Sequence, residues 1–193
     1  RQHDGEMLAF TMDSGGSGFT QIYLLDPADG DVRQLTDTPD ALNNRMVWDY
    51  SGRQLAMRST RRNGSSNDIW LLDIDAPEEA RLILAVDDGA LWKPVAFSRN
   101  DRLLLVQQYS SITDSRIHLL DLETGVLREL VGLPDERSSN VAIAFDEDDE
   151  GIFFISNQRG QSAEIGWAPL DPAGEVRWVE NSVNSDITGF ELS

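Results

Sequence analysis

The sequence contains no cysteine, which excludes disulfide bonds and thiolate chemistry. Basic residues are scarce as well: 16 Lys and Arg stand against 34 Asp and Glu, a formal net charge of −18. Such an acidic chain is a poor partner for nucleic acids, because binding to the phosphate backbone depends on Lys and Arg. No apolar run approaches the roughly 20 residues that a membrane-spanning helix requires. We therefore expect neither nucleic-acid binding nor a membrane span.

Catalytic and metal-binding patterns are also missing. No window fits the Gly-x-Ser-x-Gly elbow that presents the nucleophile of a serine hydrolase, and two histidines without cysteine leave zinc short of its usual ligands. His118 stands in an apolar run, which favours a packing role. The acidic run 146–151 resembles the start of a calcium loop, but Asn157 replaces its closing glutamate, so we interpret the run as an acidic turn. We predict no catalytic residue, no metal site and no cofactor in this chain.

The sequence does contain a repeat. The stretch DIWLLD at 68–73 is preceded by IYLLD at 22–26 and followed by IHLLD at 117–121, and a weaker copy ends at Asp171. The closing aspartates stand at positions 26, 73, 121 and 171, so the steps are 47, 48 and 50 residues. A fixed period of this length is typical of a repeat architecture.

Each repeat divides into four short apolar runs, A to D, separated by Pro, Gly, Asp and Asn. Runs B and C are almost continuously apolar, and no segment sustains a helical period of 3.6 residues. The expected strands A are 45–48, 94–97 and 141–145; strands B are 54–59, 102–106 and 151–156; strands C are 22–26, 68–73, 117–122 and 164–170; strands D are 32–36, 81–84, 126–131 and 176–179.

Four strands in a repeat of about 40–50 residues are typical of a β-propeller blade. The continuous apolar runs indicate that both faces of each sheet are buried, which the stacking of blades around an axis achieves and a two-layer sandwich does not. The expected fold class is therefore all-β: a β-propeller of about four blades, each with four antiparallel strands.

The whole chain, 1–193, divides into blade segments at about 1–40, 41–89, 90–137 and 138–186, and residues 187–193 fit the first strand A of a further blade. The sequence begins with Arg1 instead of an initiator methionine and stops where a turn between strands A and B is due. We expect an open fragment of a six- to eight-bladed ring. The alternative is that the last strand completes the first blade and closes a ring of four.

Five stretches go beyond a generic blade: GFTQIYLLD at 18–26, RQLTD at 33–37, RSTRRNG at 58–64, DLETG at 121–125 and GFELS at 189–193. Together they resemble the N-terminal β-propeller of the prolyl oligopeptidase family of serine peptidases, of the dipeptidyl-peptidase and acylaminoacyl-peptidase type. Individual blades also resemble the TolB-like, WD-like repeat, although its Trp-Ser-Pro-Asp-Gly turn appears only in altered form. The resemblance covers essentially the whole chain, and its motifs specify blade structure and not chemistry.

In that family the catalytic Ser, Asp and His lie on an α/β-hydrolase domain that follows the propeller. The resemblance therefore implies a non-catalytic propeller that gates or docks peptide substrates for a C-terminal domain absent from this chain. The expected partners are that α/β-hydrolase domain of the same protein and peptide substrates. The alternative is a TolB-like scaffold that binds a protein partner and has no enzymatic role.

Loops B–C and D–A are expected to share one face of the ring, because successive strands alternate in direction. The expected B–C loops are 13–18, 61–67, 109–115 and 157–162, and loops on a rigid scaffold commonly carry binding. The candidate binding residues are Arg61, Arg62, Asn63 and Arg159, the arginines as partners for carboxylates. The alternative is that these charges only balance nearby acids. Glu78 and Glu79 fall in a C–D turn, and we assign them no substrate-binding role.

Overall fold

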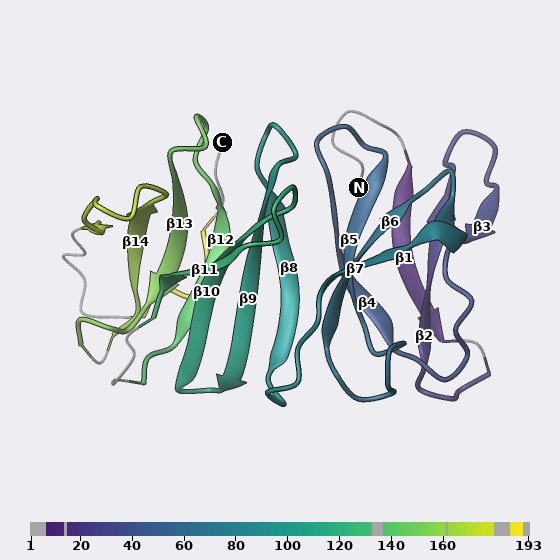
Figure 1. Cartoon of the computed structure of the whole chain (residues 1–193), viewed down its shortest axis with the longest axis horizontal. Helices are drawn as coiled ribbons and strands as arrows, with labels where there is room; N and C mark the ends of the chain where they lie inside the picture. The colour runs from purple at the N-terminus through teal and green to yellow at the C-terminus, as the bar shows by residue number, and fades with distance from the viewer. Residues whose placement is uncertain (1–6, 14, 133–136, 161, 180–185, 191–193) are drawn as a thin grey trace.

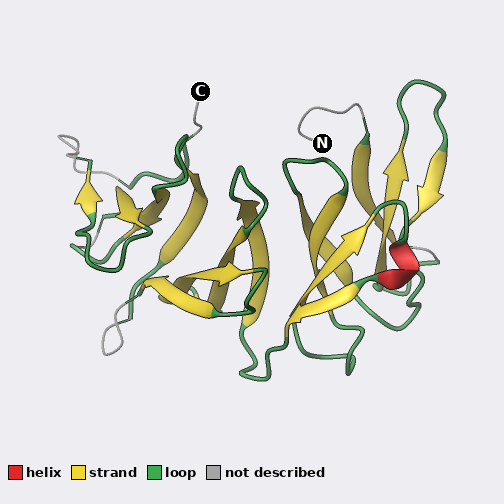
Figure 2. Cartoon of the chain, turned by 45° about the horizontal axis from the view of Figure 1, so that its top comes forward, coloured by secondary structure: helices red, strands yellow, loops and turns green. Residues whose placement is uncertain are grey.

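The recurring apolar runs form the central strands of four antiparallel sheets, blades I to IV, in the computed structural model of the chain (Figure 1). The structure describes residues 7–13, 15–132, 137–160, 162–179 and 186–190. Blade I contains β1 (Leu8–Asp13), β2 (Thr20–Leu25) and β3 (Val32–Gln34); blade II contains β4 (Asn43–Trp48), β5 (Gln54–Ser59), β6 (Asp68–Asp73) and β7 (Arg81–Leu84); blade III contains β8 (Leu91–Phe97), β9 (Leu103–Ser111), β10 (Asp114–Asp121) and β11 (Leu127–Val131); blade IV contains β12 (Asn140–Phe145), β13 (Gly151–Ser156), β14 (Glu164–Pro169) and β15 (Arg177–Trp178). A single turn of 3₁₀ helix, η1 (Pro77–Glu79), stands between β6 and β7 (Figure 2). In this described part, no helix is long and apolar enough to cross a membrane.

The blades form an arc whose inner side is lined by the first strands of blades II to IV. Within each sheet the strands follow one another in chain order, and β8 contacts both β4 and β12. Blades I and IV lie at opposite ends of the arc (Figures 1 and 2). In the sheet of blade I, β1 is an edge strand, so the described residues show an open arc and not a closed ring.

One expectation about the strands was wrong, and another stays a prediction. Residues 187–190, predicted as part of a further strand A, are paired with no described strand, although the N–H of Ile187 bonds to the carbonyl of Ala163 (3.1 Å); residues 191–193 lie outside the described part. The loop predicted at 109–115 is mostly strand, because β9 continues to Ser111 and β10 begins at Asp114. The pairing of β9 with β10 thus extends beyond the apolar run from which the strand was predicted.

The recurring aspartates are turn residues. Each of Asp26, Asp73, Asp121 and Asp171 accepts, through its Oδ1, the backbone N–H two residues later, at 2.9, 2.9, 3.0 and 2.9 Å. This Asx turn redirects the chain from strand C to strand D, which explains why an aspartate closes every copy of the repeat.

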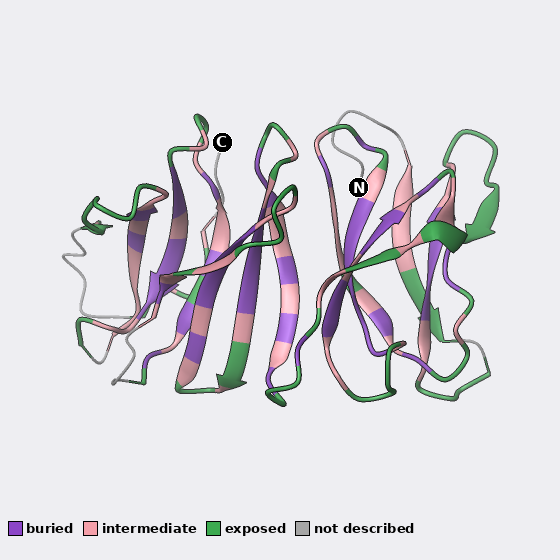
Figure 3. Cartoon of the chain, viewed as in Figure 1, coloured by how far each residue is buried: buried purple, intermediate pink, exposed green. Residues whose placement is uncertain are grey.

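Each junction between neighbouring blades contains one apolar cluster. Figure 3 shows the buried parts of the strands in purple. On β5, Leu55 and Met57 pack toward blade I and Ala56 packs toward blade III, and all three are fully buried. Alternate residues of a strand point to opposite faces of its sheet, so a strand covered on both faces must be apolar at every position. The continuous apolar runs of the sequence are confirmed as strands buried on both faces.

Aspartates also join the turns between strands A and B on the side of the arc at the top of Figure 1. Asp101 accepts the N–H groups of Tyr50 (2.6 Å) and Ser51 (3.1 Å) in the turn of the preceding blade. Asp149 likewise accepts the N–H of Arg99 at 2.8 Å. Both aspartates have a left-handed backbone, with φ of 57° and 55°. We call these two contacts the turn braces.

Replacing Asp101 by Asn tests the first turn brace. Asn tolerates the left-handed backbone but exchanges a charged acceptor for a neutral one. Since hydrogen bonds to charged groups contribute about 1.5–3 kcal/mol, we expect Asp101→Asn to lower the free energy of unfolding in urea by about 1–2 kcal/mol. The control Asp31→Asn removes the same charge from an exposed turn residue whose side chain makes no hydrogen bond to a described residue. Equal stability of the two variants would contradict the brace.

Candidate functional site

The loops that follow strands B gather on the opposite side of the arc, at the bottom of Figure 1. We define the loop face as the loops β1–β2, β5–β6, β9–β10 and β13–β14 together with the connections β3–β4 and β7–β8. All four candidate residues lie on this face, but in different blades. Arg61, Arg62 and Asn63 belong to the β5–β6 loop of blade II, and Arg159 belongs to the β13–β14 loop of blade IV.

Arg62 is the centre of an ion-pair network within blade II. Its Nε donates to Oδ2 of Asp68 at 2.7 Å, and its Nη2 donates to Oδ1 of Asp87 at 2.7 Å. Nη2 also donates to the carbonyl of Val86 at 2.9 Å. Asp68 is completely buried and accepts the N–H of Val86 at 2.9 Å as well. The hydrogen bonds from Arg62 and then from Ser66 lower the pKa of Asp87. The hydrogen bonds of the Arg62 guanidinium therefore hold the β7–β8 connection, which leads to blade III, against the β5–β6 loop.

Arg61 forms no ion pair with any described carboxylate. Its Nε donates to Oγ of Ser59 and its Nη2 to Oδ1 of Asn43, both at 3.2 Å. The guanidinium also lies over the ring of Trp70, 5.0 Å from its centroid. Burial lowers the pKa of Arg61. The side chain is thus held in place while its charge is not neutralised by a described partner.

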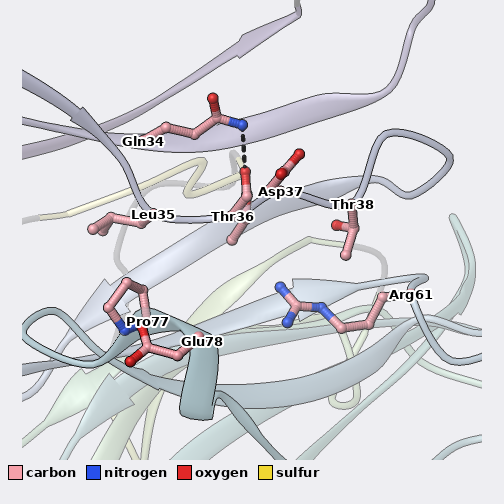
Figure 4. Close-up of a pocket in the computed structure, with 8 residues that line it drawn as sticks. All are labelled: Gln34, Leu35, Thr36, Asp37, Thr38, Arg61, Pro77 and Glu78. Carbon is pink, nitrogen blue, oxygen red and sulfur yellow. Dashed lines mark hydrogen bonds between the residues drawn. The ribbon is translucent and has the colours of Figure 1, made fainter.

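Arg61 lines a cleft of two adjoining lobes between blades I and II. The larger lobe, of about 550 Å³, is lined by Gln34, Leu35, Thr36, Asp37, Thr38, Arg61, Pro77 and Glu78 (Figure 4). The second lobe, of about 380 Å³, shares Asp37, Thr38 and Arg61 and continues to Asn63 and Gly64. Figure 4 shows the guanidinium of Arg61 between the segment 36–38 and the turn that carries Pro77 and Glu78. Volumes of this size suit small ligands.

The cleft combines one cation with two carboxylates that the sequence did not single out. Asp37 comes from the β3–β4 connection, and Glu78, to which we assigned no role, comes from η1. These segments are 41 positions apart, and only the packing of blade I on blade II brings them together. Among the described residues, no group of three or more His, Asp or Glu side chains is placed to hold a metal ion. The arrangement is suited to binding a ligand with both charged and polar groups.

The other two candidates have local partners. Oδ1 of Asn63 accepts the N–H groups of Ser65 (3.1 Å) and Ser66 (2.8 Å), which shapes its own loop. Arg159 pairs with Glu164 at 3.5 Å and lies over the ring of Trp178 at 5.6 Å. The structure therefore brings Arg61 and Asn63 together at the cleft and leaves Arg159 outside it.

Two further residues considered in the sequence have packing or turn roles. His118 is buried, its ring centroid lies 4.8 Å from that of Trp92, and burial lowers its pKa. In the acidic run 146–151, Asp146 accepts the N–H of Glu150 and the indole N–H of Trp167, both at 2.8 Å. These contacts agree with the interpretation of His118 as a packing residue and of the run as a turn.

Four-stranded antiparallel blades whose first strands line the inner side of an arc define the domain class as a β-propeller. The family profile described as prolyl oligopeptidase, N-terminal beta-propeller domain, matches residues 2–186. The chain belongs to this family. A comparison with curated protein sequences finds no match.

Solved structures share the fold at low sequence identity. TolB from Acinetobacter baumannii superposes with a TM-score of 0.72 at 17% identity, over 96% of this chain and 44% of that one. A puromycin-hydrolyzing peptidase from Mycobacterium tuberculosis gives 0.66 at 13% identity, over 92% and 31%. The β-propeller domain of the Trilobed protease from Pyrococcus furiosus gives 0.65 at 14% identity, over 95% and 56%. This chain thus spans less than two thirds of each of these structures.

Removing the buried carboxylate of the Arg62 network tests its structural role. We expect Asp68→Ala to lower the free energy of unfolding by about 3 kcal/mol, near the lower end of the range for breaking a buried pair, because Arg62 retains Asp87. The control Asp87→Ala removes the partner whose side chain is 71% exposed, and its effect should be much smaller. Denaturation of both variants gives the comparison, and equal losses would contradict the assigned roles.

The pKa of Asp87 provides a pH-dependent test of the same contact. A lowered folded-state pKa means that the contact stabilises the fold above the unfolded value of about 3.9 and that this contribution is lost as the pH falls through the folded pKa. In Arg62→Gln, an NMR titration should show the midpoint of Asp87 rising toward its ordinary value. The pKa of Asp121, lowered chiefly by the backbone N–H of Thr124, should not move. A constant Asp87 midpoint would contradict the contact.

Proposed function

We propose that this chain is the non-catalytic propeller portion of a serine peptidase, which gates or docks peptide substrates for an α/β-hydrolase domain. The observation that carries the proposal is the family match, which extends over residues 2–186 and thus over nearly the whole chain. Propellers of this family pair with α/β-hydrolase domains, which supply the acyl-transfer chemistry. The propeller contributes a rigid wall that limits access and a loop face that meets substrate or hydrolase.

The cleft between blades I and II is the proposed contact on that face. Arg61 offers a guanidinium that no described carboxylate neutralises, and guanidinium groups bind carboxylates with two parallel hydrogen bonds. Arg62 is a weaker candidate because its donors already serve Asp68, Asp87 and Val86. Asn63 borders the cleft, and Arg159 would act separately, on blade IV.

A second candidate function is a binding scaffold that holds a protein partner and catalyses nothing. It is favoured by the likeness to TolB from Acinetobacter baumannii, which covers 96% of this chain at a TM-score of 0.72. That likeness is one of fold, because the identity is only 17%. The scaffold would use the same loop face, so the two functions differ in the remainder of the protein and not in the propeller.

The gene sequence after Ser193 and a labelling experiment together separate the two functions. We expect an α/β-hydrolase stretch with Gly-x-Ser-x-Gly, and we expect the full-length protein to react with a fluorophosphonate probe because its nucleophile is activated. Substitution of the elbow serine by alanine is the control and should abolish labelling. A stop codon after one or two more blades would overturn the peptidase proposal in favour of the scaffold.

Arg61→Gln in the full-length protein tests the proposed cleft. We expect kcat/KM for short peptides to fall about tenfold, since a hydrogen bond to a charged group contributes about 1.5–3 kcal/mol. The control Arg53→Gln removes an equal charge from the opposite side of the arc, where Arg53 forms an exposed pair with Asp75 at 3.6 Å. Unchanged turnover in Arg61→Gln, or the same loss in both variants, would rule out a contact at the cleft.

A further inference from the structure

Three basic residues lie near one another at the inner side of the arc, although the chain as a whole is strongly acidic. Arg45 lies on β4 and Lys93, the single lysine of the sequence, lies on the neighbouring first strand β8. Arg58 on β5 is beside them, since its register partner on β4 is Asn44. Burial and then the charge of Arg45 lower the pKa of both Arg58 and Lys93, so Arg45 is within electrostatic reach of each of the other two cations.

No described carboxylate forms an ion pair with any of these three cations. Arg58 donates from Nε to the amide oxygen of Asn44 at 2.8 Å, which holds the side chain without neutralising its charge. Like charges brought together in a partly buried place oppose folding. The cluster is therefore unfavourable for stability in a chain that has 34 acidic residues available to compensate it.

The backbone at Arg45 is unfavourable as well. Its φ is 53°, in the left-handed region where glycine and asparagine are the ordinary residues. The position falls within an irregularity of the β4–β5 pairing, between Asn44 and Val47. Such bulges turn a side chain away from the direction that a regular strand would give it. Local rules broken together at one place are expected at functional sites.

The two inner cations line a cavity of about 220 Å³ that extends between blades III and IV. Its lining residues are Arg45, Leu91, Lys93, Gln107, Tyr109, Ser115, Ser139, Asn140 and Val141. Tyr109 and Val141 are 43% and 42% exposed, so the cavity is open to solvent. No carboxylate is among the lining residues, and a cationic ligand would find no counter-charge there.

The buried amide side chains of the cavity already form hydrogen bonds between blades III and IV. The side chain of Gln107 donates to the carbonyl of Asn140 (2.8 Å) and accepts the N–H of Ala142 (2.9 Å). Asn140 donates from Nδ2 to the carbonyl of Ser115 at 2.5 Å. The charged donors left for a ligand are those of Arg45 and Lys93. They favour an anion, and the side chains of Leu91 and Val141 favour an apolar group beside it.

We propose that this inner cavity binds the C-terminal residue of a short peptide, with Arg45 and Lys93 holding its α-carboxylate and Leu91, Tyr109 and Val141 contacting an apolar side chain. An arginine fork matches the two carboxylate oxygens, and a lysine adds a point charge. The volume is below the usual range for whole ligands and suits a single residue. The choice of a peptide as the source of the carboxylate rests on the proposed function.

Calorimetric titration of the full chain with matched peptides tests the ligand class. N-acetyl-Ala-Leu with a free carboxylate should bind at least about tenfold more tightly than its C-terminal amide, because the amide loses the charged contacts with Arg45 and Lys93. N-acetyl-Glu-Ala-Leu-amide places the carboxylate on a side chain instead and should bind as weakly as the simple amide. Equal affinity of acid and amide would overturn the proposal, and tight binding of the glutamate peptide would overturn the C-terminal assignment.

Substitutions of the two cations test the site itself. Lys93→Gln and Arg45→Asn should each weaken binding of the free acid at least about tenfold, whereas Arg81→Gln, on the exposed outer strand β7, should change it less than about twofold. The thermal midpoints of the two inner variants should stay constant or rise, because like-charge repulsion decreases. Lost binding together with a lowered midpoint in both variants would show that the cations are structural and would overturn the site.

These experiments measure binding and not hydrolysis. The inner-cavity proposal and the peptidase proposal can therefore be refuted independently of each other. If the free acid does not bind while the full-length protein reacts with the fluorophosphonate probe, the inner cavity is wrong and the peptidase function stands. If the acid binds while no hydrolase domain is present, the carboxylate site stands and its assignment to a peptidase substrate is wrong.

Discussion

The central strands of this propeller are apolar along most of their length, so both faces of their sheets must be covered, and neighbouring blades supply that cover. This requirement explains the apolar clusters at the three described junctions and the polar contacts at their ends. Where apolar faces close together, the buried amides and carboxylates must find partners, because an unpaired polar group in such a place is costly. Gln107 and Asn140 do so between blades III and IV, and Asp68 does so through Arg62. The stacking of the blades therefore determines which charged side chains have a partner within the protein and which remain available to a ligand.

Much of the fold follows from local sequence, whereas the site does not. The period of 47–50 residues, the continuous apolar runs and the closing aspartates predicted the blades, because each is a property of a short segment. The extension of β9 to Ser111 and the irregular backbone at 187–190 depend on pairing with other segments, which hydrophobic pattern does not encode. Local sequence likewise did not reveal that the guanidinium of Arg62 would form an ion pair with Asp68. One available signal was overlooked: Arg45 and Lys93 are 48 positions apart, one repeat, on successive first strands.

The distribution of charge separates two regions of the loop side. At the cleft between blades I and II, Arg61 lies with Asp37 and Glu78, so charges of both signs are present. In the inner cavity the only charged lining residues are the cations Arg45 and Lys93, although the chain as a whole is acidic. These two cations attract an anionic group only at short range, because salt screens interactions beyond about 10 Å. In the proposed role, the propeller would therefore select ligands close to its axis and not from a distance.

The turn braces and the contacts on the opposite side of the arc hold neighbouring blades together through backbone and amide groups. Asp101 ties blade III to blade II, and Asp149 ties blade IV to blade III. On the other side, Asn43 donates from Nδ2 to Oε1 of Gln21 at 3.1 Å and pins blade II to blade I. Both braces end on backbone N–H groups, which every residue except proline supplies. The turns that receive the braces can therefore change their side chains while the blades keep their mutual alignment.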